Sequence, residues 1–262
     1  MSLTGKTLSA SYKDILQVDN SNNGVTTSIK TVKDGEGTSS CLAISDDNIL
    51  IVPNNDDSTT TLQVRTNSGS QVLAVDTTNE LVTASGNYVN TQYATFAAGN
   101  AETGAFTDDT HHPIPFGSAN YAIISGVPAF GTSTDPATTF TTADGSNTLA
   151  SDLVPVMWRL PDAISIDSVT SIEGADQATG DTTRMHLQSY TFNSGSTSSL
   201  TSGALLAYNS DVTNGGSEQG YKSTWTINSG DVTAGAVVLA FFRSDSVNSD
   251  YTVNIIVKYH LR

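Results

Sequence analysis

Hydrophobic and polar positions alternate along much of the chain, and no window sustains the 3.6-residue apolar period of a helix. The alternation is clearest in DYTVNIIVKYHLR, at residues 250–262, which predicts a strand with two distinct faces. One face carries Tyr251, Val253, Ile255, Val257, Tyr259 and Leu261. Just upstream, the apolar run in GAVVLAFFRSD predicts a strand buried on both faces. These two strands are expected to form a hairpin or the closing pair of a sandwich.

Further strands are predicted upstream, near residues 119–125, 137–142, 154–160, 163–172, 183–192, 204–208 and 221–227. Between Leu187 and Tyr190 the apolar positions change parity, which predicts a β-bulge. One short turn of helix is predicted, around FAAGNAET at residues 96–103. Short strands joined by polar turns predict an all-β protein, with a β-sandwich (jelly-roll-like) head over residues 97–262.

The first 96 residues have strand-like segments but few large side chains. The segments lie at residues 25–32, 40–45, 49–53, 59–65, 71–76 and 80–84. Tyr12 is the only aromatic residue before Tyr88, whereas every Phe and Trp lies from Phe96 onward. A buried aliphatic side chain contributes only about 1.5–3 kcal/mol, and ordering a residue costs about 1.5 kcal/mol. This region is therefore not predicted to fold alone as a compact monomer.

Two arrangements would resolve this shortage of large side chains, besides a plain flexible tail. The region is disordered until it lies along a partner, or copies from neighbouring chains wrap together around one narrow core. Small side chains and repeated short strands favour the second arrangement, a slender oligomeric β stalk over residues 25–96. The predicted interface residues are Leu62, Val64, Val72, Leu73, Val75, Leu81 and Val82.

Charge and composition exclude several classes of function. The net charge of −15 repels nucleic acid and anionic membranes. The longest apolar run, AVVLAFF, is too short to span a bilayer, so no membrane insertion is predicted. The single cysteine, Cys41, excludes an intrachain disulfide and is predicted to be a small buried hydrophobe. The N-terminal sequence lacks the apolar core of a signal peptide, which fits synthesis in a bacterial cytoplasm.

The basic residues are concentrated near the N-terminus, where four lysines fall within the first 33 positions. No Lys or Arg occurs between Arg65 and Arg159. A slightly basic segment on an acidic body predicts that residues 1–24 form an arm that docks on an acidic surface, with Lys6, Tyr12 and Lys13 as the docking residues. The alternative is that these lysines simply flank turns in a short polar tail.

Motifs of known chemistry are missing from the sequence: there is no G-x-S-x-G, no G-x-G-x-x-G and no P-loop. The segment FTDDTHHPIP offers four potential metal ligands, Asp108, Asp109, His111 and His112. Adjacent histidines on an extended chain point in different directions, however, and THHP is also typical of an ordinary loop. We therefore predict no metal site and no cofactor. His186 and His260 are expected on the solvent side of their strands.

Glycan cleavage requires two carboxylates that flank the scissile bond. The candidate acids are Glu102, Asp152, Asp162, Glu173, Asp176, Asp181 and Glu218, and any acidic protein would offer as many. Trp158 and Trp225 lie within predicted strands, which favours core packing over stacking on sugars. We predict that the protein is not an enzyme.

The order of these segments resembles that of appendage proteins of tailed bacteriophages. An arm, TGKTLSASYKDILQVDNSNNGV, precedes strands such as VLAVDTTNELVTASGN and then a head that contains GDVTAGAVVLAFFR. This layout is similar to that of fibre and decoration proteins, particularly from phages of aquatic bacteria. The resemblance implies a structural protein on the virion surface, a homotrimer whose N-terminal arm binds other virion proteins.

The resemblance also implies that the head faces outward, where a host glycan or protein is a possible ligand for adhesion. Two other functions stay open at this point. The first is a capsid decoration or vertex protein, and the second is a glycan-binding or glycan-cleaving tailspike module.

Overall fold

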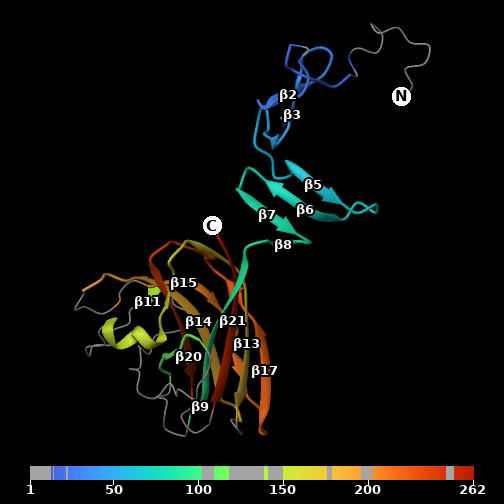
Figure 1. Ribbon diagram of the computed structural model, residues 1–262. Helices are drawn as coiled ribbons and strands as arrows, with labels where there is room; N and C mark the ends of the chain where they lie inside the picture. The colour runs from blue at the N-terminus through green and yellow to red at the C-terminus, as the bar shows by residue number, and fades with distance from the viewer. Residues whose placement is uncertain are drawn as a thin grey trace. The chain divides into compact units, whose positions relative to one another are not determined.

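Antiparallel strand pairing organises every described part of the computed structural model (Figure 1). The structure describes residues 13, 15–21, 23–101, 109–117, 139–140, 150–175, 179–195, 200, 203–245 and 251–262. These residues contain no α-helix, and they divide into two units, Met1–Val89 and Asn90–Arg262. The all-β prediction is confirmed for them.

The first unit contains two four-stranded sheets, and each is a meander in which strands consecutive in sequence pair with one another. One sheet consists of β1 (Gln17–Val18), β2 (Lys30–Lys33), β3 (Ser39–Ile44) and β4 (Ile49–Ile51). The other consists of β5 (Leu62–Arg65), β6 (Gln71–Asp76), β7 (Leu81–Ala84) and β8 (Asn87–Tyr88).

The second unit contains two larger sheets. The five-stranded sheet has the order β17–β13–β21–β9, and β19 pairs with β13. Its strands are β9 (Thr91–Ala101), β13 (Ile164–Ala175), β17 (Gln219–Thr224), β19 (Asp231–Val232) and β21 (Tyr251–Leu261). The head boundary predicted at residue 97 falls inside β9, which pairs with β21 along most of its length.

The eight-stranded sheet has the order β10–β20–β14–β15–β11, with three short strands beside this path. Its strands are β10 (His112–Ile114), β11 (Thr139–Phe140), β12 (Trp158–Arg159), β14 (Thr182–Thr191), β15 (Gly203–Tyr208), β16 (Val212–Thr213), β18 (Thr226–Ile227) and β20 (Ala236–Ser244). A 3-10 helix, η2 (Ala150–Val156), precedes β12.

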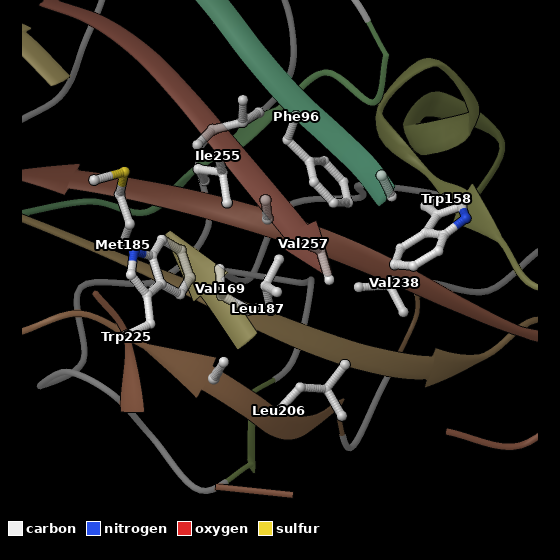
Figure 2. Close-up of a cluster of buried hydrophobic side chains, with 14 of the residues drawn as sticks. Phe96, Trp158, Val169, Met185, Leu187, Leu206, Trp225, Val238, Ile255 and Val257 are labelled. Carbon is white, nitrogen blue, oxygen red and sulfur yellow. The ribbon is translucent and has the colours of Figure 1, made fainter. Parts of the chain in front are cut away.

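The two large sheets face each other across one hydrophobic cluster (Figure 2). The five-stranded sheet contributes Phe96, Val169, Ile255 and Val257, and the eight-stranded sheet contributes Met185, Leu187, Leu206 and Val238. A second cluster includes Leu153 and Val156 of η2 together with Tyr190, Leu239 and Phe241 of the eight-stranded sheet. Strand β20 is therefore buried on both faces, as predicted, because its alternate residues enter different clusters.

The detailed strand predictions are confirmed in part. Tyr251, Val253, Ile255 and Val257 are buried and alternate with more exposed neighbours along β21. The bulge predicted in β14 between Leu187 and Tyr190 is not found, however: β14 pairs with β20 without a register shift, and the shift of β14 against β15 skips Leu206 of β15. Strands β20 and β21 lie in different sheets, one in each of the two large sheets of the second unit. They therefore do not form a hairpin.

Other predictions are wrong. FAAGNAET was predicted as a helical turn, but residues 96–101 are part of β9, because pairing with β21 overrides local helix propensity. Within the strand predicted at 154–160, residues 154–156 end η2 and only Trp158 and Arg159 form a strand, β12. Cys41 is exposed, because the meander that holds it has no second layer among the described residues. The strand predicted at 119–125 lies outside the described residues.

Candidate functional site

The sheet β5–β8 gathers aliphatic side chains on a single face. Residues directly opposite each other in an antiparallel pair share a face. Leu62 pairs with Val75, Val64 pairs with Leu73, and Val75 in turn pairs with Val82. Strand alternation adds Ala84, which lies opposite Leu73. We call this set the β5–β8 aliphatic face; its residues are Leu62, Val64, Leu73, Val75, Val82 and Ala84.

The opposite face of the same sheet is more polar. Gln63 pairs with Ala74, Ala74 pairs with Thr83, and Thr83 pairs with Tyr88. Leu81 pairs with Asp76 and lies on this face, whereas Val72 is skipped where the register of β5 against β6 shifts between Val64 and Arg65. The register therefore brings together five of the seven predicted interface residues, without Leu81 and Val72.

The β5–β8 aliphatic face is only partly covered by the chain's own described residues. None of the seven predicted interface residues is fully buried, and Val64 is 49% exposed. Within the described part of the first unit, Val32 and Ala74 are the only buried hydrophobic residues. That these faces bind other copies of the chain stays a prediction.

The sheet β1–β4 carries a comparable face that was not predicted as an interface. Leu42 pairs with Ile51 and Ile44 with Ile49, so four large aliphatic side chains share one face. Ile49 at the edge is 75% exposed. The alternation in CLAIS and the run ILIV were the available signals, but the pairing register was needed to assign the face. We call Leu42, Ile44, Ile49 and Ile51 the β3–β4 aliphatic face.

Among the predicted docking residues, Lys6 and Tyr12 lie outside the described residues. The Lys13 ammonium lies 2.5 Å from the Glu36 carboxylate, and both side chains are largely exposed. Farther along, Lys33 Nζ lies 2.7 Å from Asp19 Oδ2, and this hydrogen bond lowers the pKa of Asp19. The ion pairs show that two of the N-terminal lysines have acidic partners within the chain.

Three of the four potential metal ligands in FTDDTHHPIP are described by the structure. Among the residues that the structure describes, no group of three or more His, Cys, Asp or Glu side chains is placed to hold a metal ion. Asp109 forms an ion pair with Arg243. His111 and His112 are buried. Asp108 lies outside the described residues.

The prediction that His186 and His260 face solvent is wrong. His186 is fully buried: its ring stacks on Phe241 at 5.0 Å and meets the edge of His111 at 4.8 Å. Burial, reinforced by the charges of His111 and Arg184, holds the pKa of His186 well below its ordinary value, so its imidazole is neutral. The alternation was read correctly, but both faces of β14 are covered.

His260 is buried for a different reason. Its Nδ1 lies 2.8 Å from Oδ1 of Asp167, with both side chains largely buried. Asp167 is the additional residue where the register of β13 against β21 shifts between Ile166 and Ser168. The bulge turns the Asp167 carboxylate toward the last strand, where it covers His260.

Two of the candidate catalytic acids form hydrogen bonds within the described structure. Glu173 is 1% exposed, and its Oε1 accepts a hydrogen bond of 2.7 Å from Thr183 Oγ1. Burial raises the pKa of Glu173 to about 7, and the Thr183 hydrogen bond opposes this rise. Asp181 accepts a hydrogen bond of 3.2 Å from the Tyr251 hydroxyl.

Of the remaining candidates, Asp162 and Glu218 are exposed. Glu102, Asp176 and the Asp152 side chain lie outside the described residues. A polysaccharide cannot reach Glu173 in the folded interior, so this acid is not placed for glycan cleavage.

Both tryptophans belong to the core, as predicted. Trp158 contacts the rings of Phe96 and Tyr259, at centroid distances of 6.3 and 5.0 Å. Trp225 is buried, and its Nε1 donates a hydrogen bond of 2.9 Å to Ser171 Oγ. Neither indole is placed as an open platform for sugars.

Comparison with known proteins finds no matching family model and no matching curated protein. No helix among the described residues has the length and apolar character needed to cross a membrane. The β5–β8 and β3–β4 aliphatic faces are thus the strongest functional features among the described residues.

Proposed function

We propose that this protein is a structural, non-enzymatic appendage protein of a tailed bacteriophage. It is a homotrimeric fibre: an N-terminal arm attaches to other virion proteins, a slender β stalk follows, and a jelly-roll-like β-sandwich head faces outward. The head carries adhesion to a glycan or protein of the host surface.

One observation carries the proposal: the described strands of the first unit leave the residues of both aliphatic faces half-buried or exposed. Ile49 is 75% exposed and Val64 is 49% exposed, and both lie on faces composed of aliphatic residues. Contiguous exposed apolar surface marks a site of interaction. A stalk made of several chains would cover these faces, and their small side chains allow the strands of several copies to approach a common axis.

The second unit supports a role in display. Its two sheets close over a continuous core that includes Phe96, Trp158 and Ile255 (Figure 2). A head with its own core can be carried at the end of a stalk without depending on neighbouring heads. Several tethered heads raise the effective concentration of a weak binding site, so adhesion requires no deep pocket.

The absence of enzymatic activity is supported by the placement of the described acids. Glu173 is buried between the sheets, whereas Glu218 is exposed on the surface. A retaining glycosidase needs two carboxyl groups about 5 Å apart around an accessible sugar, and an inverting one needs them about 6.5–9.5 Å apart. We expect no product when the protein is incubated with polysaccharides.

The proposal is tested by the absolute mass of the full chain, measured by light scattering behind a sizing column. We expect a particle of three times the 27.4 kDa chain mass. A monomer whose first 90 residues are rapidly proteolysed would contradict the stalk and favour a decoration protein with a tether that orders on docking. A glycan array then tests the adhesive role of the head.

A further inference from the structure

Three strands of the first unit recur at a constant interval along the chain. Strand β2 begins at Lys30 and β5 begins at Leu62. The same interval separates the start of β3 at Ser39 from the start of β6 at Gln71. It also separates the start of β4 at Ile49 from the start of β7 at Leu81. Three consecutive antiparallel strands therefore recur in the same order and at the same separation.

The turns between these strands repeat as well. Gly37 and Gly69 are separated by the same interval as the strands, and their φ angles are 91° and 90°, which glycine adopts without strain. In the first turn the Thr38 amide donates to Asp34 Oδ1 at 2.8 Å. In the second, the Ser70 amide donates to Thr66 Oγ1 at 3.0 Å. Two different side chains thus close the same turn.

The second hairpin repeats in sequence. LAISDDNILI, at residues 42–51, and LAVDTTNELV, at residues 73–82, share Leu, Ala, Asn and Leu at the same positions and exchange Ile for Val at two others. The amide of Asn48 donates to Ser45 Oγ at 3.0 Å, and that of Asn79 donates to Asp76 Oδ1 at 2.9 Å. The interval between the two hairpin sequences is one residue shorter than the interval between the turns.

The difference of one residue between the two intervals is located at the bulges. In the first repeat the register of β2 against β3 shifts between Thr31 and Lys33. In the second, the register of β5 against β6 shifts between Val64 and Arg65. Matching turns, hairpins and strand order in the presence of this small offset indicate two copies of one unit.

The repetition preserves the aliphatic surface. In the two aligned hairpin sequences, Leu42, Ile44 and Ile51 of the β3–β4 aliphatic face correspond to Leu73, Val75 and Val82 of the β5–β8 aliphatic face. The residues stay on one face in each sheet, although the cross-strand partners differ. A single repeat cannot bury such a face by itself. Whatever covers both faces must present apolar surface at the same interval along the chain.

We infer that residues 30–61 and 62–89 are two copies of one stalk module, and that each module binds the corresponding module of a neighbouring copy of this chain. The neighbouring copy is the partner that the structure favours, because it offers an aliphatic surface with a matching interval. The inference rests on the proposed fibre function and adds that the module is the unit of self-association. Association then strengthens with the number of modules, as in other repeat proteins.

Length variants of the full chain test the inference. Deletion of residues 30–61 joins Ile29 to Leu62 and removes one complete period. Duplication of residues 30–61 adds one period. Deletion of residues 46–61 removes only half a period and leaves β3 without β4, and it serves as the out-of-phase control. Dilution followed by light scattering gives the association strength, and the fluorescence of Trp158 and Trp225 reports whether the second unit stays folded.

We expect the complete-period deletion to keep the oligomer number of the full chain and to weaken association at least tenfold. Duplication should strengthen association by a similar factor, and the half-period deletion should weaken it more than the complete-period deletion does. Equal association of the two deletions, or no gain on duplication, would overturn the module inference while the fibre proposal stands. A full chain that is monomeric at every concentration would overturn both.

Discussion

The two units of this protein use the same antiparallel pairing but differ in what lies behind each sheet. In the second unit, Phe96 and Leu187 belong to different sheets and meet in one closed cluster (Figure 2). In the first unit, Val64 and Ile49 lie on sheets with no second layer among the described residues, and both are exposed. Hydrogen bonding defines the strands in both units, whereas the burial of large side chains distinguishes a self-sufficient fold from an incomplete one.

Amino-acid composition has a different consequence in each of the two units. Aromatic residues such as Phe242 and Trp158 fill the space between two sheets within one chain. Small aliphatic residues leave a thin sheet, and we propose that other chains supply its missing layer. The position of the aromatic residues in the sequence thus indicates which unit has a core of its own.

The largest effect is expected from Phe96→Ala in the second unit. Phe96 is fully buried and its ring contacts those of Phe116 and Trp158, so its truncation leaves a cavity. We expect a loss of about 3–5 kcal/mol in the free energy of unfolding, measured by urea denaturation with tryptophan fluorescence. Phe116→Ala is the matched control: Phe116 is 38% exposed, and its truncation should cost clearly less. Equal losses would show that the cluster is not closed around Phe96.

A pH effect is expected from Glu173, also in the second unit. The folded protein holds the Glu173 proton up to a pKa of about 7, whereas the unfolded chain releases it near 4.5. Unfolding therefore releases a proton between these values, and stability falls as the pH rises from 4.5 to 7. The loss is on the order of 3 kcal/mol, since one pKa unit corresponds to about 1.4 kcal/mol.

Glu173→Gln should remove this fall in stability, while Glu218→Gln, an exposed control, should leave it in place. Urea denaturation of the three proteins at pH 5 and pH 8 makes the comparison. An unchanged pH dependence in Glu173→Gln would assign the titration to another group.

In the first unit, a charge on one face of the β5–β8 sheet should have a different effect from a charge on the other. Val75→Asp places a carboxylate on the β5–β8 aliphatic face, and Thr83→Asp places one on the opposite face. An unpaired charge in a buried interface is costly. We expect Val75→Asp to weaken association on the order of 100-fold, or about 2.7 kcal/mol, and Thr83→Asp to change it little. Light scattering on dilution measures the association of each variant. Equal weakening of association in the two variants would contradict the assignment of the face.

The smallest of these effects is expected at a buried hydrogen bond. Ser171→Ala removes the acceptor of the Trp225 indole N–H and leaves that donor buried. We expect a loss of about 1–2 kcal/mol in the free energy of unfolding. Ser165→Ala removes an exposed hydrogen bond to Asp231 and should stay within about 0.5 kcal/mol. Urea denaturation measures both losses. A larger loss for Ser165→Ala than for Ser171→Ala would contradict the burial of the hydrogen bond between Trp225 and Ser171.

Local patterns predicted the strands well where one rule dominated. The alternation from Tyr251 to Val257 gave β21, and the apolar run after Gly235 gave β20. The change of parity before Tyr190 did not mark a bulge, because Leu187 and Tyr190 lie on opposite faces of a regular strand and enter different clusters. The composition before Tyr88 correctly indicated a unit with few buried side chains.

The errors arose where tertiary contacts decide. Alternation placed His186 opposite Leu187, but only the fold shows that a second cluster covers that face. Ala97 and Ala98 favour a helix locally, yet pairing with β21 makes them part of a strand. The interface prediction was incomplete for a similar reason: register, which sequence alone does not define, places Leu81 on the face opposite Val75.

The central claim is that other copies of the chain cover the aliphatic faces of the first unit. Carbene footprinting of the full chain, read residue by residue by mass spectrometry, tests this most directly. In a single chain Ile49 is 75% exposed and Val64 is 49% exposed, and Ile172 in the second unit, at 57%, is a matched reference. We predict that Ile49 and Val64 are labelled far less than Ile172. Labelling that follows the single-chain order, with Ile49 highest and Val64 close to Ile172, would contradict the account.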